Sequence, residues 1–166
     1  MQLPYEIVHA ERADLDRIVE IYNTTIASRM VTADLEPVSV ESREAWFEAH
    51  NERRRPLWVM KENGRIIAWL SFSDFHSRAA YDSTVEISIY LSPECRARGI
   101  GSLFLQKAIE ECPRLGIRRI VALVFAHNEP SLALLRKFGF EQWGYLPEVA
   151  RMDGNDVDVV IMGREA

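Results

Sequence analysis

The sequence has few cysteines and no long apolar run, and each shortage excludes a class of protein. Only two cysteines, Cys95 and Cys112, occur among the 166 residues, and they form no C-x-x-C pair. A disulfide scaffold or a cysteine-rich zinc site is therefore excluded, and a reducing, cytoplasmic setting is expected. No apolar stretch approaches the roughly 20 residues that span a bilayer, and the first residues lack a signal-peptide pattern, so we expect no membrane partner.

Positive charge is also scarce. The 20 lysine and arginine residues are outnumbered by 25 aspartate and glutamate residues, which gives a formal net charge of −5. A general nucleic-acid-binding protein normally presents a basic face, so we expect no nucleic-acid partner. His9, His50 and His127 have no metal-ligand spacing with each other or with the cysteines, so we expect no metal site.

The chain does contain one informative central stretch, residues 84–112. Polar and apolar side chains alternate from Thr84 to Leu91, which is the period of a half-buried strand, and Pro93 ends that strand. An apolar stripe with helical spacing then runs from Ile100 to Cys112. The stretch is therefore predicted to fold as a strand, a basic glycine-containing turn and a helix.

The turn between that strand and that helix has the composition of an anion site. Gly99 and Gly101 lack a Cβ atom, so an anion could approach the backbone N–H groups of the first helical turn closely. Arg96 and Arg98 add positive charge. The turn fits neither G-x-x-x-x-G-K-[ST] nor G-x-G-x-x-G. We expect the turn to bind a pyrophosphate; the alternative is a plain tight turn with solvated arginines.

Apolar periodicity and turn signals place the remaining elements in a single domain over residues 1–166. Asn63-Gly64 and Asp153-Gly154 are typical of hairpin turns, and Asn128 is typical of a helix N-cap. We expect further helices starting near Asp14, near Ser39 and after Asn128. We expect further strands over residues 5–9, 57–61, 65–72, 120–125, 140–149 and 157–162.

Two longer connectors and two residue groups complete the pattern. Residues 28–37 are polar and could form a loop over a pocket, and residues 74–83 form a second loop before the central strand. Arg53–Arg55 is either an anion patch or, as we favour, a solvated helix end. We expect the four tryptophans to lie in the core rather than to form a stacking platform; they are Trp46, Trp58, Trp69 and Trp143.

The order of these elements, together with three local motifs, resembles the GNAT acyltransferase superfamily. The motifs are Arg96-x-x-Gly99-x-Gly101, Asn128 with Ser131, and Gly139-Phe140. The resemblance implies an α/β (α+β) fold, with a mixed, largely antiparallel central sheet of about seven strands flanked by about four helices. It also implies acetyl-CoA as the acetyl donor.

A closer resemblance is to the phosphinothricin and methionine sulfoximine/sulfone N-acetyltransferase branch. The matching segments are Ile21-Tyr22-Asn23, Arg43-x-x-Trp46, Arg78-Ala79-Ala80-Tyr81 and residues 84–90, with Gly144 and Asp158 near the C-terminus. This branch implies direct acetyl transfer to the amine of a small amino-acid-like substrate, and a homodimer. The alternatives are acetylation of a peptide or protein N-terminus or a polyamine, and a non-catalytic acetyl-CoA sensor.

Glu86 is the candidate general base. Acetyl transfer to an amine needs a group that takes the amine proton, directly or through water. Glu86 lies on the polar side of the strand that leads into the proposed pyrophosphate turn, and burial would raise the pKa of its carboxyl group. The resemblance assigns the same role to this residue. The alternative is a surface carboxylate that pairs with lysine or arginine.

The central strand and the turn after it are the candidate acetyl-CoA site. The resemblance implies that the strand splays from its neighbour after Ser88, so that its backbone pairs with the pantetheine arm and polarises the thioester carbonyl. Asn128 would contact the pantetheine or pyrophosphate, or act as a plain N-cap. The candidate residues are Ser88, Ile89, Tyr90, Leu91, Arg96, Ala97, Arg98, Gly99, Ile100, Gly101, Ser102, Asn128 and Ser131.

The loop before the central strand is the candidate acceptor site. Arg78 would bind a substrate carboxylate, because a guanidinium matches a carboxylate in a bidentate pair; the alternative is an ordinary charged loop residue. The candidate substrate-binding residues are Phe75, His76, Ser77, Arg78, Tyr81, Val85, Glu86 and Ile87.

The sequence also departs from this branch. His76 stands where the branch usually has a second arginine, and Leu135 stands where the family has a tyrosine or histidine acid. Tyr90 or water would then protonate the leaving thiolate. Residues 149–156 lack the usual glycine, lysine and tryptophan, which puts phosphinothricin itself in doubt as substrate. Cys95 lies beside the turn and could react, but no base stands at a recognisable spacing from it.

Overall fold

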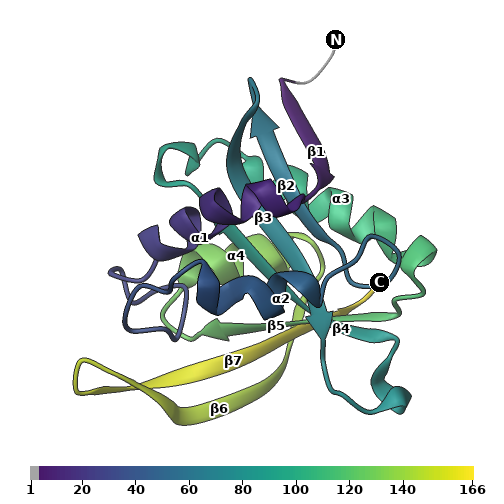
Figure 1. Ribbon diagram of the computed structural model, residues 1–166. Coiled ribbons are helices and arrows are strands. Elements are labelled where there is room, and N and C mark those ends of the chain that lie inside the picture. Colours follow the sequence, from purple (N-terminus) through teal and green to yellow (C-terminus); the bar gives the residue numbers. More distant parts are fainter. Residues whose placement is uncertain (1–3) are drawn as a thin grey trace.

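The computed structural model describes residues 4–166, which form one mixed α/β domain (Figure 1). The helices of the described part are α1 (Leu15–Thr24), α2 (Glu44–Glu48), α3 (Ile100–Leu115) and α4 (Glu129–Lys137). Its strands are β1 (Tyr5–His9), β2 (Leu57–Glu62), β3 (Arg65–Asp74), β4 (Thr84–Leu91), β5 (Arg119–Phe125), β6 (Glu141–Met152) and β7 (Asn155–Glu165). The expected order of elements is confirmed.

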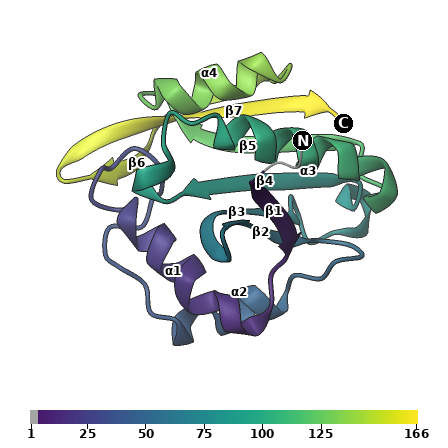
Figure 2. The ribbon, with the colours of Figure 1, turned by 90° about the horizontal axis from the view of Figure 1, so that it is seen from above.

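The seven strands form one sheet in the order β1-β2-β3-β4-β5-β7-β6. Neighbouring strands are antiparallel except for β4 and β5, which are parallel. Viewed from above, α1 and α2 lie on one side of the sheet, while α3 and α4 lie on the other (Figure 2). The mixed, largely antiparallel sheet expected from the family resemblance is therefore confirmed.

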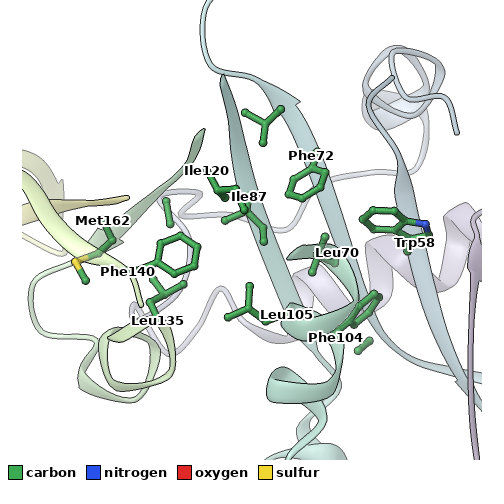
Figure 3. Close-up of a cluster of buried hydrophobic side chains, with 14 of the residues drawn as sticks. Trp58, Leu70, Phe72, Ile87, Phe104, Leu105, Ile120, Leu135, Phe140 and Met162 are labelled. Carbon is green, nitrogen blue, oxygen red and sulfur yellow. The ribbon is translucent and has the colours of Figure 1, made fainter. Parts of the chain in front are cut away.

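Alternating side chains explain why the sheet can be covered on both faces. Val85 and Ile87 of β4 are buried in the larger core, which α3 and α4 complete with residues such as Phe104 and Leu135 (Figure 3). Tyr90 points to the other face and packs on a smaller core that α1 closes. Because successive residues of a strand point to opposite faces, β4 contributes to both cores and also presents polar residues beside the smaller one.

The turn residues adopt the backbone conformations that their types favour. Asn63 and Gly64 both have positive φ angles, of 51° and 80°, as a two-residue hairpin turn requires. Asp153 and Gly154 repeat this geometry between β6 and β7. Gly139 has φ of 81° after α4, as expected of a residue that ends a helix. The hairpin predictions are therefore confirmed.

Three expectations from the sequence are wrong in detail. The second helix is only Glu44–Glu48, after a 3-10 turn at Glu41–Arg43, and it packs on the smaller core through Trp46 and Phe47. Arg55 is 3% exposed rather than solvated, since its Nε donates to Asp74 Oδ1 at 2.6 Å. Trp143 is 47% exposed, so it does not belong to the core. Within residues 4–166, no helix is long and apolar enough to cross a bilayer.

Replacing Phe104 with alanine should destabilise the domain strongly. Phe104 is fully buried in the larger core, whereas its neighbour Leu103 is 36% exposed on the same helix. We expect Phe104→Ala to lower the free energy of unfolding by about 3–5 kcal/mol, because a cavity replaces the ring. Leu103→Ala should lower it by at most about 1 kcal/mol. Urea denaturation followed by tryptophan fluorescence measures both changes, and equal losses would contradict this assignment of the core.

Candidate active site

A cleft opens where β4 and β5 separate. The two strands pair at only three positions, Thr84 with Arg119, Val85 with Ile120 and Glu86 with Val121. From Ile87 onward, β4 pairs only with β3 within the described chain, so its edge toward β5 lacks a strand partner. The separation leaves a cavity of about 480 Å³ between the strands. Backbone N–H and C=O groups that lack a ladder partner in such a cleft are available to a ligand.

Eight of the predicted site residues line this cleft together. They are Glu86, Ile87, Ser88, Ile89, Tyr90, Leu91, Asn128 and Ser131. Val31, Thr32 and Ala33 also line it, so residues 28–37 do form a loop over a pocket, as expected. These three residues were not among the predicted site residues, because a polar loop carries no signal of where its middle part folds.

Asn128 links the loop to the helix behind the cleft. Its side-chain oxygen accepts a hydrogen bond from the Ser131 N–H at 3.3 Å, so the predicted N-cap is confirmed. Its Nδ2 donates to the backbone oxygen of Met30 at 2.9 Å. Asn128 is buried and its polar groups are occupied within the fold. One side chain therefore fixes both the start of α4 and the position of the loop over the cleft.

Glu86 lies half-buried at the point where the strands part. Burial raises the pKa of its carboxyl group above its ordinary value, and no lysine or arginine among residues 4–166 opposes that shift. The alternative reading, a surface carboxylate paired with a cation, therefore finds no support. Ser73 of β3 is the cross-strand partner of Glu86. A carboxylate with a raised pKa, placed at the mouth of a cleft, is suited to act as a proton acceptor.

The turn between β4 and α3 has the geometry of an anion site. Ala97 and Gly99 have positive φ angles of 61° and 76°, which turn the chain sharply into the first turn of α3. A Cβ atom on Gly101 would lie 3.0 Å from Leu134 Cδ2, so glycine allows α3 to pack closely against α4. The first-turn N–H groups of a helix have no intrahelical acceptor and carry the positive end of the helix dipole.

The charges around this turn differ from the sequence expectation. Arg98 donates to Glu62 Oε1 at 2.7 Å and to the Tyr5 hydroxyl at 3.0 Å, so its charge is compensated inside the fold. Lys137, at the end of α4, places its Nζ 3.3 Å from Ser102 Oγ in the first turn of α3. Sequence reasoning missed Lys137. Only the packing of α4 against α3 brings this cation to the turn.

The predicted acceptor residues do not gather in the cleft. Phe75, His76, Ser77, Arg78 and Tyr81 are all exposed in the connector between β3 and β4, and none of them lines the cavity. The rings of Phe75 and His76 both contact Tyr81, with centroid distances of 5.8 and 4.8 Å. Val85 is buried in the larger core and does not line the cavity, so only Glu86 and Ile87 of this set lie in the cleft.

The remaining candidate nucleophile and acid are also placed by the structure. Cys95 is fully buried, and burial raises the pKa of its thiol; Cys112 is buried as well, with a pKa of about 11. Both thiols are free, and neither is an exposed nucleophile. The cytoplasmic setting expected from the low number of cysteines stays a prediction. Burial also raises the pKa of Tyr90, which keeps its hydroxyl protonated in the cleft. No cluster suited to a metal ion occurs among residues 4–166.

Comparison with known proteins gives consistent matches. The model of the acetyltransferase (GNAT) family matches residues 16–140. The chain is 53% identical over 157 residues to YwnH of Bacillus subtilis (strain 168), provisionally named a phosphinothricin acetyltransferase, covering 94% of this chain and 96% of YwnH. It is 31% identical over 151 residues to an L-methionine sulfoximine/L-methionine sulfone acetyltransferase of Pseudomonas paraeruginosa, covering 90% and 88% of the two chains.

A solved structure extends the likeness to three dimensions. The crystal structure of a GNAT superfamily phosphinothricin acetyltransferase from Sinorhizobium meliloti, in complex with acetyl-CoA, superposes with a TM-score of 0.91. That protein is 32% identical in sequence, and the match covers 98% of this chain and 89% of the other.

Proposed function

Because the chain belongs to the GNAT acetyltransferase family, we propose that it transfers acetyl directly to the amine of a small amino-acid-like substrate, of the phosphinothricin or methionine sulfoximine/sulfone type. The enzyme shares its general activity with its relatives: it is an acetyl-CoA-dependent N-acetyltransferase. The observation that supports direct transfer to such a substrate is the position of Glu86, half-buried at the mouth of the β4–β5 cleft with no cationic partner among residues 4–166.

The cleft fits the shape and chemistry of an acetyl-CoA arm. The unpaired edge of β4 over residues 88–91 would bind the amide-bearing pantetheine as an added strand does. The first turn of α3, with Gly101 and Ser102, would bind the pyrophosphate through backbone N–H groups. Lys137 would add the positive charge that Arg98, paired with Glu62, does not supply. Asn128 and Ser131 complete the wall between these two parts of the site.

Each reacting proton has a nearby group in the cleft. Glu86 accepts a proton from the substrate ammonium, directly or through water, so that the amine lone pair can form the new N–C bond. Backbone N–H groups of β4 polarise the thioester carbonyl, whose carbon–sulfur bond breaks. Tyr90 or water gives a proton to the departing thiolate, and the second proton that the nitrogen loses as the amide forms replaces it. Bound acetyl-CoA supplies the activated acetyl group; the protein supplies orientation, polarisation and proton transfer.

Arg78 is the candidate for binding the acceptor's carboxylate. It is exposed in the connector just before β4, and its backbone N–H donates to Nδ1 of His76 at 3.3 Å. A long guanidinium side chain in this position can reach toward the mouth of the cleft without competing for an internal acidic partner. The single arginine in this loop also keeps open the rival function, acetylation of an amine that has no carboxylate.

Glu86→Gln should remove most of the activity while leaving donor binding intact. We expect kcat/KM for methionine sulfone to fall about 10²- to 10⁴-fold, because glutamine cannot accept the proton. The affinity for acetyl-CoA, measured by calorimetry, should stay unchanged. Burial raises the pKa of Glu86, and the base must be ionised, so wild-type activity should fall as pH drops through that raised value. Glu110→Gln, on the exposed face of α3, is the matched control, and a similar loss there would sink the assignment.

Arg78→Gln should distinguish amino-acid acceptors from simple amines. We expect the variant to raise KM for methionine sulfone about 10- to 100-fold, since a charged hydrogen-bonded contact is lost. KM for the corresponding amine without a carboxylate should not change. Steady-state thiol-release assays on both compounds, run beside Arg53→Gln, measure the difference. Turnover confined to peptides or polyamines would support the rival function, and tight acetyl-CoA binding with no turnover would support a sensor.

We also propose that the protein is a homodimer joined through β6. This edge strand exposes Trp143, Tyr145, Leu146 and Val149, and β5, which β7 separates from it in the sheet, exposes Leu123. The β6–β7 hairpin projects from the body of the domain (Figure 1). Exposed, apolar edge strands are avoided in monomeric proteins unless something covers them. A second copy of the chain, with the same edge, is the occupant that this surface fits.

Val149→Asp should convert the dimer to a monomer. A buried carboxylate opposite apolar side chains would oppose association, so we expect the weight-average mass in sedimentation equilibrium to fall by about half. Leu103→Asp, at an exposed position of α3 far from β6 in the fold, should leave the mass unchanged. A wild-type protein that sediments as a monomer at high concentration would refute the proposed dimer.

A further inference from the structure

A second cavity lies beside the cleft and has no role in the reaction described so far. It measures about 130 Å³ and lies between α1, α2 and the faces of β3 and β4. Ser88 and Tyr90 line both this cavity and the cleft, so the two spaces share a wall. The other lining residues are Ile18, Val19, Tyr22, Val38, Arg43, Trp46, Trp69, Ser71 and Ser73.

Hydroxyl groups lead from the candidate base into this cavity. Ser73 is the cross-strand partner of Glu86, and Ser71 is the cross-strand partner of Ser88. Residues paired in this way point to the same face of an antiparallel sheet, about 4.5–5.5 Å apart at Cβ. All three serines line the cavity. An acceptor whose amine lies at Glu86 would therefore extend its side chain past a row of hydroxyl groups.

Aromatic rings cover the helix side of the cavity, where Tyr22 and Trp46 lie, and one end of its sheet side, where Trp69 pairs with Tyr90. Trp69 stacks on Tyr90 with a centroid distance of 4.6 Å, and Trp46 meets Trp69 edge-on at 5.3 Å. Tyr22 packs against Tyr90 at 5.1 Å. Aromatic faces make favourable apolar contacts with methyl groups. The cavity thus combines an apolar wall with a hydroxyl-lined wall.

The cavity carries no uncompensated charge. Arg43 is its one charged lining residue in the described chain, and Arg43 Nη2 lies 3.1 Å from Asp34 Oδ2. The Tyr22 hydroxyl donates to the same carboxylate, and the Arg43 guanidinium lies 4.8 Å from the centre of the Tyr22 ring. The positive charge is therefore satisfied inside the protein. An anionic group entering the cavity would lose its hydration without gaining a free cation.

We propose that this cavity receives the side chain of the acceptor amino acid and selects neutral polar tails over anionic ones. The inference rests on the proposed N-acetyltransferase function and names the substrate class for that site. A sulfone or sulfoximine group fits both walls, because its methyl contacts the aromatic rings and its oxygen accepts from the serines. A phosphinate, carboxylate or ammonium tail has no counter-charge there. The preferred acceptors are therefore amino acids with a short, neutral, oxygen-bearing tail.

Acceptor pairs test the charge preference on the unmodified enzyme. Methionine sulfone and phosphinothricin both carry an α-amine and an α-carboxylate, but only phosphinothricin has an anionic tail. We expect kcat/KM to favour methionine sulfone about 10- to 100-fold, as for a polar group denied its partner. Asp34→Asn, which frees the charge of Arg43, should narrow that ratio. Equal use of the two acceptors by the wild-type enzyme would overturn the proposal.

Two cavity variants test the location. Ser71→Val fills the hydroxyl-lined wall and Trp46→Ala removes the aromatic wall, so each should lower kcat/KM for methionine sulfone about tenfold or more. Glycine has no side chain to place there and serves as the matched acceptor; its kcat/KM and the KM for acetyl-CoA should stay unchanged. Equal losses on glycine and methionine sulfone in both variants would overturn the location. No turnover on any acceptor would instead refute the proposed function, on which this inference depends.

Discussion

The site depends on where the pairing of two parallel strands stops. β4 and β5 form three ladder pairs, and the cleft begins at the last of them, Glu86. Each strand is held on its other side by a longer antiparallel partner, β3 for β4 and β7 for β5. The open edge is therefore fixed before a ligand arrives. Preorganised backbone groups stabilise developing charge without the cost of rearrangement.

The same β4 strand separates the two cores and so divides the chemistry between two faces. Odd-numbered residues such as Ile87 fill the larger core, while Glu86, Ser88 and Tyr90 face the side that α1 closes. Removing one residue from β4 would exchange these faces, which is why its register matters more than that of other strands. The base, the cleft wall and the second cavity thus depend on a single strand register.

Sequence patterns predicted the elements well because their signals are local. Alternation located β4, and Asn63-Gly64 located a hairpin. Contacts between distant segments were not predictable in this way. Lys137 reaches Ser102 only through helix packing, and Trp46 and Ser71 share a cavity only because α2 folds over β3. Trp143 was misassigned because hydrophobicity alone does not separate a core residue from an exposed apolar surface.

Leu146 and Val149 are exposed on β6 and also line the β4–β5 cleft. The outer wall of the cleft and the apolar edge are thus the same piece of chain. Any copy that covers this edge changes the surroundings of the cleft as well, so self-association and donor binding are linked by mass action. This thermodynamic linkage is reciprocal. If a bound ligand strengthens the association of two chains by some factor, association of the chains strengthens ligand binding by the same factor.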